Sequence, residues 1–121
     1  MVMKKLLYTL LAVSLMFSAC KKEEEDNIFT GNWTGTYSGD DSGVWAATIS
    51  STGDINGSST NSIGDNQNLS GSVTSNGSFS ATAGSGTLGS NFVGQLSGNS
   101  GSGTWTNSSV GFTGTWEGDK Q

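Results

Sequence analysis

Seven short segments of this chain alternate large apolar residues with Ser, Thr and Asn, and each carries glycine or alanine at the centre of its apolar set. Two examples are Trp33-Gly35-Tyr37 and Phe112-Gly114-Trp116. Alternation at period two predicts β-strands with one buried face, because successive side chains in a strand point to opposite sides. Glycine is a poor strand former, so its repeated position between aromatic residues indicates a structural requirement at mid-strand.

Turn signals rich in Gly, Asn and Asp recur about every eight to twelve residues between these segments. Links as tight as Asn76-Gly77 favour antiparallel pairing of neighbours in sequence. The chain is therefore predicted to be all-β, a small eight-stranded antiparallel meander barrel. The predicted strands are 32–38, 43–51, 54–60, 67–75, 78–83, 90–97, 101–107 and 110–117.

The central glycines and alanines fit the interior of such a barrel. Eight strands enclose a space barely wide enough for their own side chains. Small residues at mid-height let aromatic side chains from other levels lean over them and let the strands coil tightly. The seventh strand departs from this order, with Gly103, Trp105 and Asn107 in its inward positions. Outward positions such as Thr34 and Thr113 are polar, the reverse of a membrane-spanning barrel, so an aqueous barrel is predicted.

The N-terminus carries a separate signal. Lys4 and Lys5 precede an apolar run from Leu6 to Phe17, which is followed by small residues and Cys20. This order is typical of a secretory signal peptide, predicted here as a helical segment at residues 1–19. The apolar run is shorter than the roughly 20 residues that a membrane-spanning helix needs.

The sequence Phe17-Ser18-Ala19-Cys20 resembles the lipobox of bacterial lipoproteins. The resemblance implies that Cys20 becomes the acylated first residue and that its acyl chains bind the membrane, which is sufficient for anchoring without a transmembrane helix. The alternative is a secreted protein with an unpaired cysteine.

Residues 20–28 are charged and poor in apolar residues, which predicts a flexible tether. Lys21 differs from the Asp that resembles an inner-membrane retention signal, which favours the outer membrane, at its periplasmic face or at the cell surface. The run of Lys and acidic residues also resembles the surface-export signals of some Gram-negative lipoproteins. A solvated spacer is the alternative.

The barrel domain is predicted at residues 29–121. Its Gly31-Asn32-Trp33 resembles the Gly-x-Trp signature of the first strand of lipocalins and other calycins, and Gly114-Thr115-Trp116 is similar to the avidin branch of that architecture. The repeated Phe-x-Gly pattern in 92–116 resembles the small barrels of surface lipoproteins related to transferrin-binding proteins. These resemblances imply a meander barrel and do not transfer a biotin site.

Composition excludes several function classes. The chain has no His or Arg, and no Lys between Lys22 and Lys120, so nucleic acid is not an expected partner. Without His and with one Cys, no zinc or copper site is expected, and neither 54–58 nor 64–68 has the spacing of a calcium loop. We expect no cofactor and no enzymatic activity, because the acidic residues occur at predicted turns or near the terminus: Asp40, Asp41, Asp54, Asp65, Glu117 and Asp119.

Six aromatic residues have two interpretations. They either fill the core or line a pocket for a small apolar or ring-shaped ligand at the barrel mouth. A non-catalytic ligand-binding lipoprotein is the preferred prediction. The alternative is a structural or interaction protein of the cell envelope that contacts glycan or another protein through its Ser/Thr-rich surface. The candidate ligand-binding residues are Trp33, Tyr37, Trp45, Trp105, Phe112 and Trp116.

Overall fold

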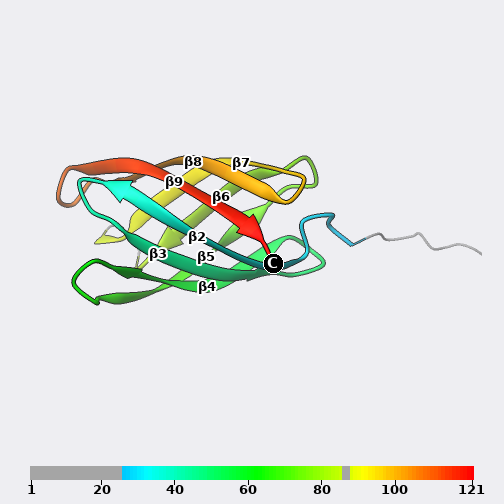
Figure 1. Cartoon of the computed structure of the whole chain (residues 1–121), viewed down its shortest axis with the longest axis horizontal. Coiled ribbons are helices and arrows are strands. Elements are labelled where there is room, and N and C mark those ends of the chain that lie inside the picture. Colours follow the sequence, from blue (N-terminus) through cyan, green and yellow to red (C-terminus); the bar gives the residue numbers. More distant parts are fainter. Residues whose placement is uncertain (1–25, 86–87) are drawn as a thin grey trace, which may run out of the picture.

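The computed structural model describes residues 26–85 and 88–121, which form eight antiparallel strands in a closed barrel (Figure 1). The predicted signal peptide, Cys20 and most of the predicted tether lie outside the described residues. The strands are β2 (Gly31–Gly39), β3 (Gly43–Ile49), β4 (Asp54–Asn61), β5 (Asn66–Val73), β6 (Ser78–Ala83), β7 (Ser90–Ser97), β8 (Ser100–Asn107) and β9 (Phe112–Lys120).

Each strand pairs with the next one in sequence, and β2 pairs with β9 to close the barrel. The predicted all-β meander is therefore confirmed. The last strand was predicted to end at 117, but it continues to Lys120 because both of its neighbours extend that far: Trp33 of β2 pairs with Lys120, and Ser100 of β8 pairs with Asp119. Glu117, the last residue of the predicted strand, and Asp119 beyond it are both strand residues.

The three hairpins β3–β4, β4–β5 and β5–β6 have turns with the same hydrogen-bond pattern. In the second of them Asn61 N–H donates to the carbonyl of Asp65 (3.0 Å), and Asn61 Oδ1 accepts the N–H of Asp65 (2.9 Å). Gly64 supplies the left-handed conformation that the turn requires, with φ of 90°. Ser50 and Thr74 begin the other two turns in the same way. Asp65 thus occurs in a turn, as predicted.

One end of the barrel is closed by the segment 27–30. Phe29 is buried there, with its ring centroid 6.4 Å from that of Trp33, and its carbonyl accepts the indole N–H of Trp33 (2.8 Å). Asn27 N–H donates to the carbonyl of Ser51, and Asn27 Nδ2 to that of Val73. Asn27, assigned from the sequence to the tether, is therefore bonded to the barrel. We call this end the plugged end; the C-terminus also lies there (Figure 1).

The mid-strand glycines make room for tryptophan rings, as predicted. Trp116 of β9 pairs directly with Gly103 of β8, and its indole crosses that glycine to donate to the carbonyl of Val93 on β7 (3.0 Å). A methyl group at Gly103 would lie 2.7 Å from Trp116 Nε1. Two more tryptophans use the same arrangement: Trp45 crosses Gly35 to reach the carbonyl of Glu117, and Trp105 crosses Gly114 to reach that of Ser38.

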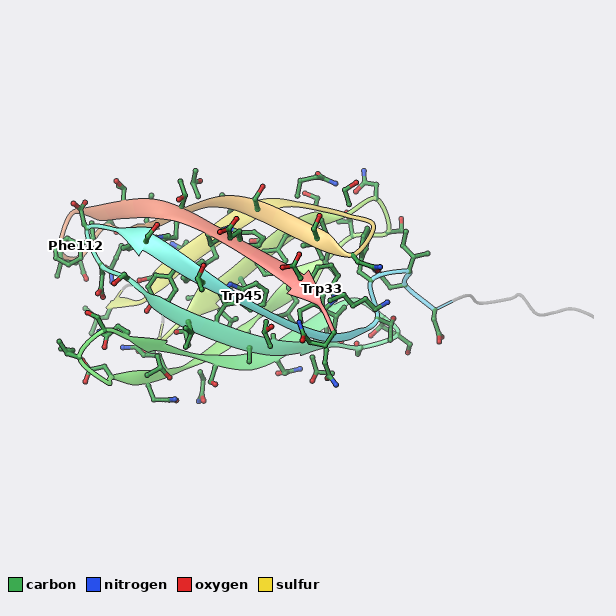
Figure 2. The ribbon with its side chains drawn as sticks, viewed as in Figure 1. Trp33, Trp45 and Phe112 are labelled. Carbon is green, nitrogen blue, oxygen red and sulfur yellow. The ribbon has the colours of Figure 1, made fainter. Side chains whose placement is uncertain are left out.

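The large apolar side chains predicted to point into the barrel are buried in the structure, with one exception. Phe112, predicted to point into the barrel, is 39% exposed because it begins β9 at the rim of the end opposite the plug. Figure 2 shows Phe112 at that end, Trp33 at the plugged end and Trp45 between them. The end with Phe112 is called the mouth.

Candidate ligand site at the mouth of the barrel

The mouth contains a cavity of about 270 Å³. Its lining comes from β2, from β4 to β9, and from the adjoining loops, so strands far apart in the sequence contribute to one site. This volume lies just below the roughly 300–1,000 Å³ that is usual for ligand pockets, so the cavity has room only for a small ligand of about one ring.

Three aromatic side chains form the wall of the cavity. Tyr37, Phe92 and Trp105, called the mouth triad, have ring centroids between 5.5 and 6.2 Å apart. Tyr37 meets the other two rings edge-on, a favourable arrangement for aromatic pairs. The indole N–H of Trp105 is already bonded to the carbonyl of Ser38 (3.0 Å), which fixes the ring. The triad therefore offers a ligand rigid ring surfaces.

Two buried hydroxyl groups in the lining have no hydrogen-bond partner among the described residues. Ser59 is 5% exposed and Tyr37 is 8% exposed, and both line the cavity. Buried polar groups in proteins are almost always hydrogen-bonded, because leaving one unpaired costs about 1–3 kcal/mol. These hydroxyls are donors and acceptors that an occupant of the cavity can satisfy.

The rim of the cavity is polar. Asp41 Oδ1 accepts the N–H of Ser42 (2.8 Å), and its Oδ2 lies 3.4 Å from Asn61 Nδ2. Asn107 Nδ2 donates to Ser90 Oγ (3.2 Å), which ties β8 to β7 at this level. Asp65 and Gln67 also line the cavity. Aromatic walls below a polar rim favour a ligand whose ring carries polar edges.

Burial raises the pKa of the Tyr37 hydroxyl above its ordinary value of 10.0, and the negative charge of Asp41 adds to this effect. The folded state thus holds this proton more tightly than the unfolded chain. The contribution to stability is full below about pH 10 and is lost as pH rises through the folded pKa. We expect the melting temperature to fall with pH in this alkaline range, and to fall less steeply in Tyr37→Phe. Equal slopes for the two proteins in thermal melts between pH 8 and 12 would contradict the assignment.

Of the six aromatic residues predicted to bind ligand, three lie at the mouth and three do not. Tyr37, Trp105 and Phe112 line the mouth cavity. Trp33 lies at the plugged end, because four residues along a strand move a side chain about 13 Å. Trp45 and Trp116 are buried with Phe79 as a second cluster, with ring centroids 4.6 to 6.1 Å apart.

The sequence interpretation did not assign several lining residues to the site. Phe92, Ser59, Asn61 and Gln67 line the cavity but were not among the six candidate residues. The available signal was position: each lies near a strand end that adjoins a loop on the Phe112 side. Reading which strand ends share one end of the meander would have grouped them.

Within residues 26–85 and 88–121, no three acidic, His or Cys side chains come close enough to hold a metal ion. The same part of the chain contains no helix long and apolar enough to cross a membrane. The fold and the site together define a small antiparallel barrel with one plugged end and one cavity-bearing mouth. The chain matches no protein-family model, no curated protein and no solved structure.

Proposed function

We propose that this protein is a non-catalytic binding module that takes a small, ring-shaped ligand with polar edges into the mouth of its barrel. The observation that carries the proposal is the combination of the mouth triad with two buried hydroxyls that lack partners among the described residues, in one cavity of about 270 Å³. The mouth triad would contact the ring of the ligand through stacking and edge contacts, and the two hydroxyls would orient the ligand through hydrogen bonds. Such convergence of apolar walls and a few polar groups is the usual composition of a ligand pocket.

The proposal places the protein in the cell envelope. The lipobox-like sequence at Cys20 supports an acylated N-terminus and an outer-membrane location, at the periplasmic face or the cell surface. The closed eight-stranded meander is compatible with a calycin-like barrel, the class to which the Gly31-Asn32-Trp33 and Gly114-Thr115-Trp116 resemblances point. Eight-stranded barrels such as those of lipocalins and streptavidin hold one small ligand in their interior, which supports the site proposed here.

The first experiment is native mass spectrometry of the full-length protein purified from its own host. A retained ligand of about one ring in size would support the binding function, and the mass of the N-terminus tests acylation of Cys20 in the same spectrum. Benzyl alcohol and benzylamine serve as defined probes in parallel NMR titrations. We expect both to shift amide signals of residues around the mouth, including those of Phe92 and Trp105.

A matched pair of variants on β6 locates the binding. Ala83 is buried and lines the cavity, so Ala83→Leu fills part of the mouth, whereas Ser80→Leu places the same side chain on the outer face of the same strand. We expect Ala83→Leu to weaken probe binding at least tenfold and Ser80→Leu to leave it unchanged. The proposal fails if neither probe shifts mouth residues at tens of millimolar, or if the two variants bind alike.

The alternative interaction function also has an observation in its favour. A shallow groove of about 780 Å³ crosses the outer face of β9, β2, β3 and β4, and its lining includes Thr34, Thr36, Val44, Ser58 and Glu117. Hydroxyl groups beside an exposed valine could contact a glycan chain or another protein. Titration with a soluble oligosaccharide such as chitotriose would favour this function if the shifts follow the groove and leave the mouth unchanged.

A further inference from the structure

The described residues at the mouth of the barrel include acidic side chains and no basic one. Asp41 and Asp65 line the mouth, and Asp40 belongs to the same β2–β3 loop, where its carboxylate accepts the N–H of Thr113. The single basic side chain among the described residues is Lys120, and its Nζ lies 3.4 Å from the carbonyl of Ile28 at the plugged end. The mouth therefore carries negative charge with no neighbouring cation from this part of the chain.

The mouth carboxylates also keep free acceptor capacity. Asp65 receives no side-chain hydrogen bond from the described residues, and Asp41 receives one short bond and one long one, at 2.8 and 3.4 Å. A carboxylate can accept about four hydrogen bonds. Ser59 and Tyr37, buried beneath this rim, add two hydroxyl groups without partners among the described residues.

The aromatic wall of the cavity suits the same kind of ligand. A cation held over the face of Trp, Tyr or Phe within about 6 Å is attracted by the negative face of the ring. Trp105 and Phe92 are stacked at 28° with centroids 6.2 Å apart, and Tyr37 stands across them. An ammonium group at the rim would meet carboxylate oxygens, while the ring that bears it would lie in the cavity against the mouth triad.

We propose that the mouth selects organic amines, ligands that carry a protonated amine or a quaternary ammonium group next to a small ring, and that it rejects the corresponding carboxylates. This inference rests on the proposed function and adds the chemical class of its ligand. The cation is recognised by Asp41 and Asp65 and the ring by the mouth triad. Because the two carboxylates lie near solvent, the selectivity decreases with salt.

The test uses three probes that share one ring and differ in charge: benzylamine, benzyl alcohol and benzoate, titrated at pH 7 and followed by NMR shifts of mouth residues. We expect benzylamine to bind at least tenfold more tightly than benzyl alcohol, and benzoate to bind least. Asp41→Asn and Asp65→Asn should each reduce the benzylamine preference several-fold, and the double variant should abolish it. Asp119→Asn, on β9 towards the plugged end, is the control and should leave the preference intact.

Each outcome bears on one proposal. Equal binding of all three probes at the mouth would overturn the selection of amines and leave the ring-binding function standing. Binding of none would overturn both. A preference for benzylamine that survives the double variant, or that is unchanged in 1 M NaCl, would also overturn the inference, because the carboxylates would then not be its source.

Discussion

Replacing Gly103 with alanine is expected to cost about 3 kcal/mol or more of folding free energy, although alanine is a small residue. The added methyl group would lie 2.6 Å from Cα of Gly94 and 2.7 Å from Trp116 Nε1, and closer still to the carbonyl of Val93. The first and last of these belong to the backbone of β7, so relief requires the strand to move. Overpacking of a dense core typically costs 1–3 kcal/mol, and displacement of a strand in a closed barrel adds to that.

Urea denaturation followed by tryptophan fluorescence measures this effect, and the melting temperature should fall by about 12 °C or more for a domain of this size. Gly98→Asn is the control, because Gly98 has φ of 61° and no atom within 4 Å of an added side chain. Asparagine tolerates that conformation, so the control should stay within about 0.5 kcal/mol. A Gly103→Ala protein as stable as the control would refute the crossing of Gly103 by Trp116.

A double-mutant cycle separates two contributions to the cost of Gly103→Ala: the contact with the Trp116 ring and the clash with the backbone of β7. In a Trp116→Phe background the contact with the indole nitrogen is lost, while the clash with the backbone of β7 remains. The cost of Gly103→Ala should therefore be smaller in that background by about 0.5–3 kcal/mol, the usual range for residues in contact. Full additivity would show that the tryptophan ring is not what the glycine accommodates.

Phe29→Ala is expected to destabilise the barrel by about 3–5 kcal/mol, the usual cost of removing a buried phenylalanine ring. Phe29 is the buried apolar residue of the segment that closes the plugged end, and its ring contacts Trp33. Its main-chain bonds, including the acceptance of the Trp33 indole N–H, do not depend on the ring, so the loss reports burial alone.

The neighbouring residue provides the comparison. Ile28 is 72% exposed, so Ile28→Ala should change the free energy of unfolding by less than about 0.5 kcal/mol. Both are measured by chemical denaturation, with Phe29→Leu as a milder variant if the alanine protein does not fold. Similar values for Phe29→Leu and Ile28→Ala would mean that the segment 27–30 does not plug the barrel. The mouth lies at the other end, so the folded Phe29 variants should bind benzylamine like the parent protein.

The fold could be predicted from the sequence because nearly every strand repeats the same local pattern of residues. Period-two alternation gives the buried face, and positions such as Gly35 and Gly114 show that the interior is crowded, which is a property of a small closed barrel. The strand ends were harder to place. Asp119 lies beyond the predicted strand end at 117, next to the chain terminus, and its pairing with β2 and β8 makes it part of the strand.

The site was accessible only in part. Tyr37 and Trp105 were identified as aromatic and inward-facing, but Trp33 has the same features and lies at the other end. Ser59 appears in the sequence as a polar interruption of an apolar face, and its position in a cavity depends on strands that meet only after folding. Asn27 similarly resembles tether, although its amide bonds to Val73, 46 residues away. Contacts over such separations leave no local pattern in the sequence.

Both ends of the described chain lie at the plugged end, so an anchor attached before Asp26 would orient the barrel relative to the membrane. From Cys20 to Asp26 the chain can extend at most about 20 Å, whatever path it takes. An acyl anchor on Cys20 would hold the plugged end near the bilayer and turn the rim around Phe112 toward the surrounding medium. Solutes would then arrive without first crossing the lipid surface, and a reporter fused after Gln121 would sit on the membrane side, away from their route of entry.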